Sequence, residues 1–310
     1  MTAETRVRRP SFWRRFWGRW NQREGYVLVL PSFLHLLVFF LIPLGFSLYL
    51  SFHDWRGLNT RNAPFVGLEN YEFMLGDRRW WAALRNTLYY TFVSVPLGMV
   101  VSLGIAMLMN LRIPGVYLFR AVFFLPVITS WVAVSVVWLW VLDGNIGLLN
   151  YALSLIGIDG PDWLTDPRTA MLALILIATW KGAGFQMIIW LAGLQGIPKE
   201  LYEAALVDGA SALQRFRYVT LPLLAPTTFF LLITGVIGSF QVFTPVFVLT
   251  QGGPLGSTDV AVYRIYQRAF VSFDFGYASA LAWVLFAFIF VATLIQLAYM
   301  RRNLGRVYGR

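Results

Sequence analysis

The sequence predicts an all-α integral membrane protein with six transmembrane helices and both termini in the cytoplasm. Of its 310 residues, 58% are hydrophobic and 13% are charged, whereas a soluble domain carries about 25% charged residues. Six apolar runs reach the ~20 residues that an α-helix needs to cross a bilayer. Counting Arg120 at the start of the third span, the segments on the side of the N-terminus carry 16 Lys and Arg. Those on the other side carry 7, with Arg85 and Lys181 set apart because they lie at or within spans. Because cytoplasmic connections are enriched in these residues, the side of the N-terminus is predicted to be cytoplasmic.

The first 25 residues are basic, and residues 26–84 are predicted to hold the first span and an external connection. In the basic segment, aromatic side chains fall on one helical face, opposite Arg14, Arg15 and Arg19. This pattern is typical of a helix in the headgroup layer, and a basic tail without fixed structure is the other reading. The apolar run at 26–50 is too long for a signal peptide and is followed by no small-residue cleavage site. It is therefore predicted to remain as the first span.

The other five spans follow in order along the chain. They are predicted at about 86–109, 117–142, 170–194, 223–250 and 276–300. The external connections are 51–85, 143–169 and 251–275, with a turn and a short interfacial helix at 64–71. A tight turn at 110–116 contains Pro114 and Gly115, and the cytoplasmic tail is 301–310.

The cytoplasmic connection at 197–226, between the fourth and fifth spans, has stronger helix signals than a simple link requires. Pro198 suits the first position of a helix, which is predicted to run to about Asp208. Gly209 suits the residue after it, because a left-handed helix cap favours glycine. The connection is therefore predicted to begin with a short helix that stops at this glycine.

A second short helix is predicted directly after the first. Ser211 and Gln214 have the spacing of a capping box, in which each side chain bonds the backbone of the other residue. The pair Leu221-Pro222 is predicted to interrupt this helix and admit the next span. The result is a helix–turn–helix held in water between two membrane spans, which is what a docking surface for another protein requires.

Three elements of this connection resemble, at matching spacing, the EAA loop of binding-protein-dependent ABC importer permeases. They are Glu203-Ala204-Ala205, Gly209 and Val219-x-Leu221-Pro222, with Val219 where the family usually has Ile. In that family the loop supplies a helix that fits a cleft on the ATP-hydrolysing subunit. The resemblance implies a coupling loop at 197–222 whose contact residues are Glu203, Ala204, Ala205, Asp208, Gly209, Leu221 and Pro222. Taken alone, Glu203 also suits a solvated carboxylate on an ordinary loop helix.

Further stretches resemble the sugar-type branch of the same family, and the resemblance covers nearly all of 26–300. They lie at 65–71, 123–126, 180–185, 191–198, 250–254 and 276–280. The resemblance implies a type I importer (MetI-like) permease fold over 85–300, in the cytoplasmic membrane of a bacterium or archaeon. It also implies import of a carbohydrate or of a polyol phosphate such as glycerol 3-phosphate. Unlike the longest members, this chain has short outer loops.

The resemblance also implies a set of partners. They are a second, similar permease, two copies of a cytoplasmic ATPase and an external solute-binding protein, in addition to the lipid bilayer. The formal net charge of +10 suggests nucleic acid at first, but the concentration of basic residues on the cytoplasmic side explains this charge. No nucleic-acid partner is therefore expected.

Five side chains inside predicted spans are candidates for a substrate path. Lys181 lies near the centre of the fourth span, where a charge is costly unless it is paired or hydrated; it suits either a hydrated path or a contact with carbonyls or an acid at a helix end. Gln186 and Gln241 suit sugar hydroxyls or bonds between helices. Trp138 and Trp180 suit stacking on a sugar ring or anchoring at the interface.

Several kinds of chemistry are absent from the sequence. It has no Cys, and neither of its two lysines, Lys181 and Lys199, lies in a P-loop. Motifs for hydrolases and metalloproteases are missing as well. The chain is therefore predicted to be no enzyme, with no catalytic residues, metal or cofactor of its own and with ATP bound by a partner subunit. The alternatives are a secondary transporter or channel working without an ATPase, and a membrane enzyme; the helix–turn–helix and the lack of a repeat weigh against the first.

Overall fold

The computed structural model describes residues 22–57, 63–111 and 114–307, and these residues are helical apart from turns, loops and two isolated β-bridges. Within the described ranges, four helices are long and apolar enough to cross a membrane. Two bent pairs of helices also qualify if each pair is counted as one span, which raises the number to six. The predicted all-α membrane fold is confirmed. The proposed headgroup helix within residues 1–25 falls almost wholly on residues 1–21, outside the described part.

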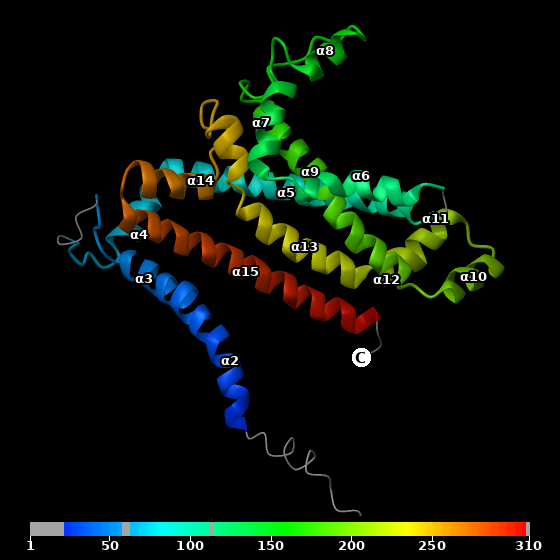
Figure 1. The fold of residues 1–310 in the computed structure, drawn as a ribbon, viewed down its shortest axis with the longest axis horizontal. Helices are drawn as coiled ribbons and strands as arrows, with labels where there is room; N and C mark the ends of the chain where they lie inside the picture. The colour runs from blue at the N-terminus through cyan, green and yellow to red at the C-terminus, as the bar shows by residue number, and fades with distance from the viewer. Residues whose placement is uncertain (1–21, 58–62, 112–113, 308–310) are drawn as a thin grey trace, which may run out of the picture.

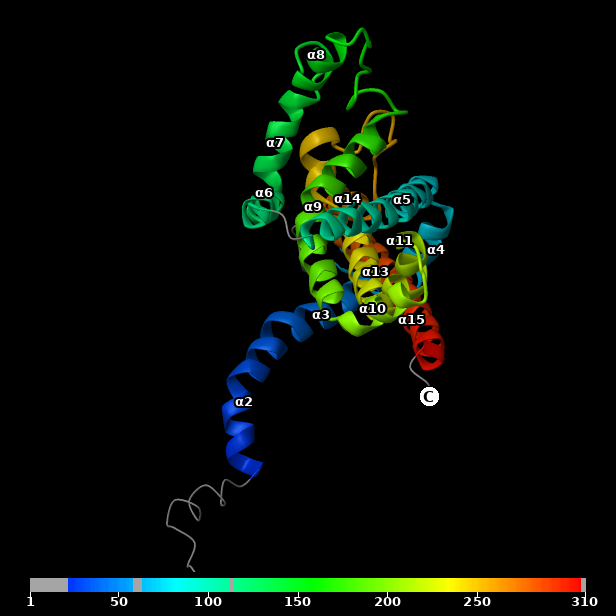
Figure 2. The ribbon, with the colours of Figure 1, turned by 90° about the vertical axis from the view of Figure 1, so that its right-hand side faces the viewer.

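The first span is one continuous helix made of three segments. They are α2 (Gln22–Leu36), η1 (Leu37–Leu41) and α3 (Ile42–Leu50). Its side chains between 28 and 49 are almost all exposed, and Leu50 is buried at its end. Figures 1 and 2 show α2 running away from the other helices. Most of the apolar surface of this span is therefore not used in the packing of the chain on itself, although α3 contacts the last helix of the chain.

The second span begins earlier than predicted, because α5 (Arg78–Met109) starts at Arg78 and not at Asn86. Asp77 caps this helix: its Oδ1 accepts hydrogen bonds from the backbone N–H of Arg79 at 2.9 Å and of Trp80 at 3.3 Å. Such a cap satisfies donors that the first turn of a helix cannot pair internally. Trp80 is fully buried, so packing also holds the extra turns.

The same carboxylate joins α5 to the last span, α15 (Phe275–Val307), and to η4 (Gln267–Val271). The hydroxyl of Tyr277 donates to Asp77 Oδ2 at 2.9 Å, and Arg268 Nη2 lies 3.4 Å from that oxygen. Burial acts to raise the pKa of Asp77, but these partners and the two backbone N–H groups hold it below its ordinary value. The short helix predicted near 64–71 is α4 (Glu69–Gly76), and its Phe73 packs edge-on against Tyr277.

The predicted third span, 117–142, is broken into two helices. The prediction of one uninterrupted span is therefore wrong in the middle of this range. The helices α6 (Val116–Ile128) and α7 (Trp131–Val141) meet at 101°. Between them Thr129 (φ −78°, ψ 141°) and Ser130 (φ −58°, ψ 140°) are extended. Short hydroxyl side chains favour helix ends over helix interiors, and the carbonyls that the break leaves free find a partner in α9, described below.

The predicted break at Leu221-Pro222 is also displaced. The second loop helix runs from α11 (Ala212–Arg215) through η2 (Phe216–Thr220) into α12 (Leu221–Leu223), and the 64° bend follows at Leu224. The wider turn of η2 brings the N–H of Leu221 to Phe216 O, directly before Pro222. Because proline lacks an N–H, it is tolerated in the first turn of α12.

The fifth span is shorter than the predicted 223–250. The helix α13 (Ala225–Phe240) ends at Gln241, and η3 (Val246–Thr250) follows only after Pro245. The predicted external loop at 251–275 contains α14 (Ala261–Tyr266), which runs directly into η4. Likewise α8 (Leu148–Ser154) lies within the predicted loop at 143–169.

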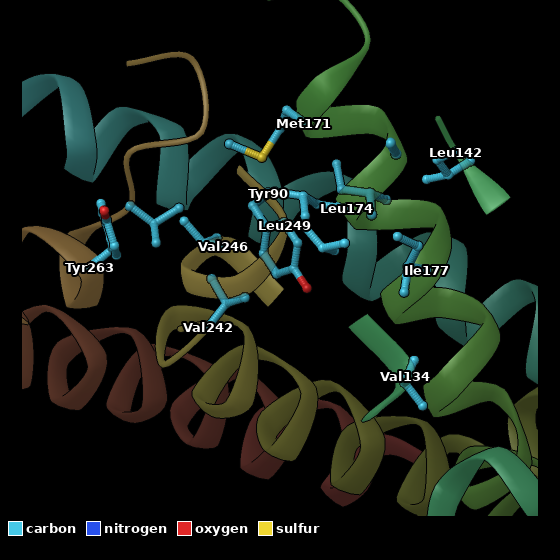
Figure 3. Close-up of a cluster of buried hydrophobic side chains, with 13 residues drawn as sticks. Tyr90, Val134, Leu142, Met171, Leu174, Ile177, Val242, Val246, Leu249 and Tyr263 are labelled. Carbon is cyan, nitrogen blue, oxygen red and sulfur yellow. The ribbon is translucent and has the colours of Figure 1, made fainter. Parts of the chain in front are cut away.

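The centre of the bundle is α9 (Ala170–Gln195), which matches the predicted fourth span closely. It packs against α5, α6 and α13. At Gly184, a Cβ would overlap the carbonyl oxygen of Phe123 in α6, so the two backbones touch. Figure 3 shows one of the buried clusters around α9, with Leu174 and Ile177 facing Tyr90 of α5 and residues of η3.

The connections separate towards two ends of the bundle. In Figure 1, α10 (Lys199–Val207), α11 and the C-terminal end of α15 lie towards the right, while α4 and the start of α15 lie at the left. The helix α8, from the predicted external connection 143–169, stands at the top of Figure 1 and at neither of these ends. The picture therefore agrees with the predicted grouping for the loop at 197–222, the C-terminal end and α4.

Candidate functional site

The first helix of the loop at 197–222 ends in a Schellman motif built on Gly209. The helix α10 follows Pro198, which is its N-cap and not its first helical residue, and ends at Asp208. The N–H of Gly209 donates to Leu206 O at 3.0 Å, and the N–H of Ala210 donates to Ala205 O at 2.9 Å. Gly209 has φ +77°, a conformation that costs other residues energy. The predicted stop at this glycine is confirmed.

The second helix of the loop starts with the predicted capping box. Ser211 N donates to Gln214 Oε1 at 2.7 Å, and Gln214 N donates to Ser211 Oγ at 3.3 Å. The two helices are joined by a hydrogen bond of 3.0 Å between the hydroxyls of Tyr202 and Thr220. Tyr202 also packs against a buried cluster that contains Trp190 of α9. The loop is therefore fixed to the central span.

The outer surface of this loop combines acidic and apolar side chains. Glu203, Ala204 and Asp208 are exposed, as is Leu221, while Ala205 and Pro222 are half-buried. Large apolar side chains stand beside them: Val207 is 89% exposed and Leu213 is 74% exposed. Such a surface suits a protein partner better than water.

A second candidate site is a cavity of about 310 Å³ enclosed by α5, the start of α7, α9 and the residues around the end of α13. We call it the central cavity. Its polar lining residues are Ser94, Thr179, Gln186, Ser239, Gln241 and Thr244, and its aromatic ones are Tyr90, Trp131 and Phe243. Tyr90 belongs to the buried cluster of Figure 3, so the wall is rigid on that side.

The amide of Gln186 belongs to a chain of hydrogen bonds. The indole N–H of Trp190 donates to Ser102 Oγ at 3.1 Å. The Ser102 hydroxyl lies 3.1 Å from two acceptors, Gln186 Oε1 and Met99 O. Because Gln186 also lines the cavity, its amide connects the cavity wall to this buried pair.

Lys181 lies at the break between α6 and α7. Its Nζ donates to Pro126 O at 2.8 Å and to Thr129 O at 2.7 Å, and it sits 5.0 Å from the centre of the Trp131 ring. A cation at the C-terminal end of a helix is favourable, because the free carbonyls there carry partial negative charge. Of the two readings of this residue, the contact with carbonyls at a helix end is therefore the one observed.

The structure brings together only two of the five predicted path residues. Gln186 and Gln241 line the central cavity, whereas the residues around this cavity do not include Lys181, Trp138 or Trp180 in the described part of the chain. The two tryptophans pack against each other, with ring centres 5.6 Å apart. The path role of all five stays a prediction.

Sequence reasoning missed Trp131 and Thr179 as lining residues. Trp131 directly follows Thr129 and Ser130, and Pro126 stands shortly before them. A proline and two hydroxyl residues inside an apolar run are the available signs of a break there. Thr179 lies in the middle of α9. The direction in which its side chain points depends on how the helices pack, which the sequence does not reveal.

Residues 76–304 match the family model of the binding-protein-dependent transport system inner membrane component. The chain belongs to this family. A relative in Bacillus subtilis, the probable ABC transporter permease protein YesP, is 40% identical over 89% of the chain and 90% of its own length. The trehalose/maltose transport system permease protein MalF of Thermococcus litoralis is 35% identical over 88% and 92%.

Solved structures agree with this family assignment. A bacterial ABC transporter involved in the import of the acidic polysaccharide alginate matches with a TM-score of 0.82 and 27% identity, covering 93% of this chain and 99% of that one. Another structure of such a transporter holds an alginate pentasaccharide-bound periplasmic protein. The expected type I permease fold is therefore confirmed, and this family member is a multi-span inner membrane component of a transport system.

Proposed function

We propose that this chain is the permease subunit of an ATP-driven importer, and that the loop at 197–222 couples it to a cytoplasmic ATPase. The observation that carries the proposal is the build of this loop. Two short helices with defined caps expose Glu203, Val207 and Leu213. The hydrogen bond between Tyr202 and Thr220 joins these helices, and the packing of Tyr202 fixes them to the bundle. A rigid surface with exposed apolar groups can bind a partner and transmit its conformational change to the membrane helices, whereas a flexible link cannot.

The proposed partners follow from the family and from the exposed surfaces. A second permease completes the translocation path, two ATPase copies bind the coupling loops and carry the ATP, and an external binding protein delivers the solute. The apolar surface of α2 and α3 that this chain leaves uncovered is consistent with membrane neighbours. The related alginate transporter in complex with a periplasmic protein supports the external partner. The proposed location is the cytoplasmic membrane of a bacterium or archaeon.

The proposed solute is a carbohydrate or a polyol phosphate. Relatives that carry trehalose/maltose and alginate support this assignment. So does the central cavity, which combines amide and hydroxyl side chains with the aromatic ring of Trp131. Cavities that bind small molecules commonly combine apolar walls with a few placed polar groups and measure about 300–1,000 Å³. The central cavity therefore suits one or two rings of a short saccharide.

The test uses Gly209→Val in the full complex, with Gly157→Val as the matched control. Both glycines have φ +77°, and at both a Cβ meets no other atom within 4 Å. Only the first lies in the loop. We expect Gly209→Val and Glu203→Lys to insert normally but to retain less ATPase in a pull-down and to lose solute uptake. Gly157→Val should behave as the wild type. Wild-type retention and uptake in both loop variants would refute the coupling role.

A further inference from the structure

The lining of the central cavity is electrically neutral. None of the described residues that line it is Asp, Glu, Lys, Arg or His, although its walls come from four different segments of the chain. An ionised group that leaves water for such a site needs an opposite charge or a dense set of donors. The lining offers isolated amides and hydroxyls.

The cation nearest to the cavity lining is already engaged. Lys181 is 6% exposed, and its ammonium donates to the carbonyl oxygens of Pro126 and Thr129. The same ammonium lies over the ring of Trp131, which stands in the cavity wall. One face of this indole is therefore occupied by the cation, and a solute meets only the other face or the edge. The positive charge is balanced by the end of α6 and is not presented to a solute.

The neutral groups of the wall are nevertheless prepared for a hydrogen-bonding guest. The lining carries hydroxyl side chains at Ser94 and Thr244 and an amide at Gln241. Each of these groups can both donate and accept hydrogen bonds. Gln186 lines the cavity as well, and its amide supplies an acceptor and two donor hydrogens. Donors, a hydroxyl and an aromatic ring together fit the alternating polar edges and apolar faces of a sugar ring.

We infer that the central cavity binds an uncharged, hydroxyl-rich solute, and that it rejects uronates and sugar or polyol phosphates. The inference rests on the proposed function and narrows its solute class to neutral saccharides or polyols. Selection at this cavity would act after delivery by the binding protein, so a charged solute would be refused even if it were delivered.

The test places a single thiol in the cavity of this Cys-free chain. Gly238 lines the cavity and is exposed, and a Cβ there meets no other atom within 4 Å. Gly238→Cys is assembled into the full transporter in detergent, and its alkylation rate is measured with maltotriose, trigalacturonate or glycerol 3-phosphate. Gly76→Cys is the control, because Gly76 is equally open but lies at the end of α4.

We expect maltotriose to slow alkylation of Gly238→Cys at least threefold, trigalacturonate and glycerol 3-phosphate to leave it unchanged, and none to affect Gly76→Cys. Adding Gln241→Lys, which puts a cation into the cavity at the C-terminal end of α13, should make trigalacturonate protective. If either anion protects Gly238→Cys as well as or better than maltotriose does, in the chain without Gln241→Lys, the inference is overturned. Lack of protection by all three overturns it as well.

ATPase retention and ATP-driven uptake are measured on the same preparations. A complex that retains its ATPase and imports solute, while its cavity thiol is protected by an anion, contradicts the solute class and leaves the proposed function intact. A complex that retains no ATPase contradicts the proposed function independently of thiol protection.

Discussion

Lys181 shows how a single residue makes a break inside a membrane span possible. Where α6 ends, the carbonyl oxygen of Pro126 accepts only a long backbone hydrogen bond of 3.4 Å from Thr129, and Lys181 donates to the carbonyl oxygens of both residues. In lipid an unpaired carbonyl and an unpaired ammonium each cost several kcal/mol. Together they satisfy each other, so neither the break nor the charge is expected to be stable alone.

We therefore expect Lys181→Met to lower the stability of the protein by about 1–3 kcal/mol, the cost of leaving buried polar groups unpaired. The methionine keeps most of the side-chain length and removes only the donor. Thermal unfolding of the purified protein measures the change. Lys199→Met is the control, because Lys199 is the other lysine of the chain and is exposed on α10. A Lys181→Met protein as stable as the control would contradict the capping role.

The contacts of Asp77, at the other end of the bundle, predict that the stability of the fold depends on pH. Burial acts against its ionisation, but Tyr277, the backbone donors and Arg268 lower its pKa in the folded protein. A lowered pKa stabilises the fold above the unfolded value of 3.8, and this contribution is lost as the pH falls through the folded value.

Asp77→Asn should therefore be less stable than the wild type near neutral pH, and the difference should shrink below the unfolded pKa of 3.8. Asparagine can still cap α5, so the change tests mainly the charge. The measurement is thermal unfolding of both proteins from about pH 7 down to about pH 3, with Glu200→Gln on the exposed face of α10 as a control. A constant difference at every pH would show that the charge of Asp77 does not matter.

Among the elements, the coupling loop depends on one hydrogen bond between its two helices. Tyr202→Phe keeps the ring in its buried cluster and removes only the hydroxyl that meets Thr220 Oγ1. A net cost of about 0.5–1.5 kcal/mol is expected for the loss, concentrated where α10 is held against η2. We expect reduced uptake at unchanged protein abundance. Tyr218→Phe, in η2 of the same loop but 70% exposed, should leave uptake unchanged. Equal uptake in both variants would show that the hydrogen bond between Tyr202 and Thr220 is not needed for coupling.

The loop could be predicted well because its signals are local. Gly209 after α10 and the spacing of Ser211 and Gln214 each determine a cap within a few residues. The break after α6 was not predictable in this way, because its partner Lys181 lies 52 residues beyond Thr129. In a run of apolar residues, length alone suggests one straight helix.

The candidate cavity was predictable only in part, for a related reason. Polar residues within spans can be recognised in the sequence, which is how Gln186 and Gln241 were found. Whether a tryptophan faces a cavity or another tryptophan depends on how the helices pack, and so Trp138 and Trp180 were chosen where Trp131 lines the wall.

At the scale of the whole molecule, the placement of α10 and α11 towards one end of the bundle gives a test of topology (Figure 1). Ser211→Cys and Gly256→Cys each introduce the only thiol of a chain without cysteine. Because basic residues gather on one side, an impermeant reagent should label Gly256→Cys in intact cells and Ser211→Cys only after the membrane is opened. Labelling of Ser211→Cys from outside would invert the topology and remove the proposed ATPase contact.

The contact at Gly184 has a mechanical consequence. There the backbones of α6 and α9 touch, and one turn away Lys181 fastens the end of α6 to the same helix. Two rods joined at neighbouring points cannot slide or roll on each other, so α6 and α9 behave as one beam. The residues Thr129 and Ser130 then set the angle at which α7 leaves this beam. The helix α7 is held there in turn, because Trp138 packs on Trp180 of α9 and α7 contacts η3.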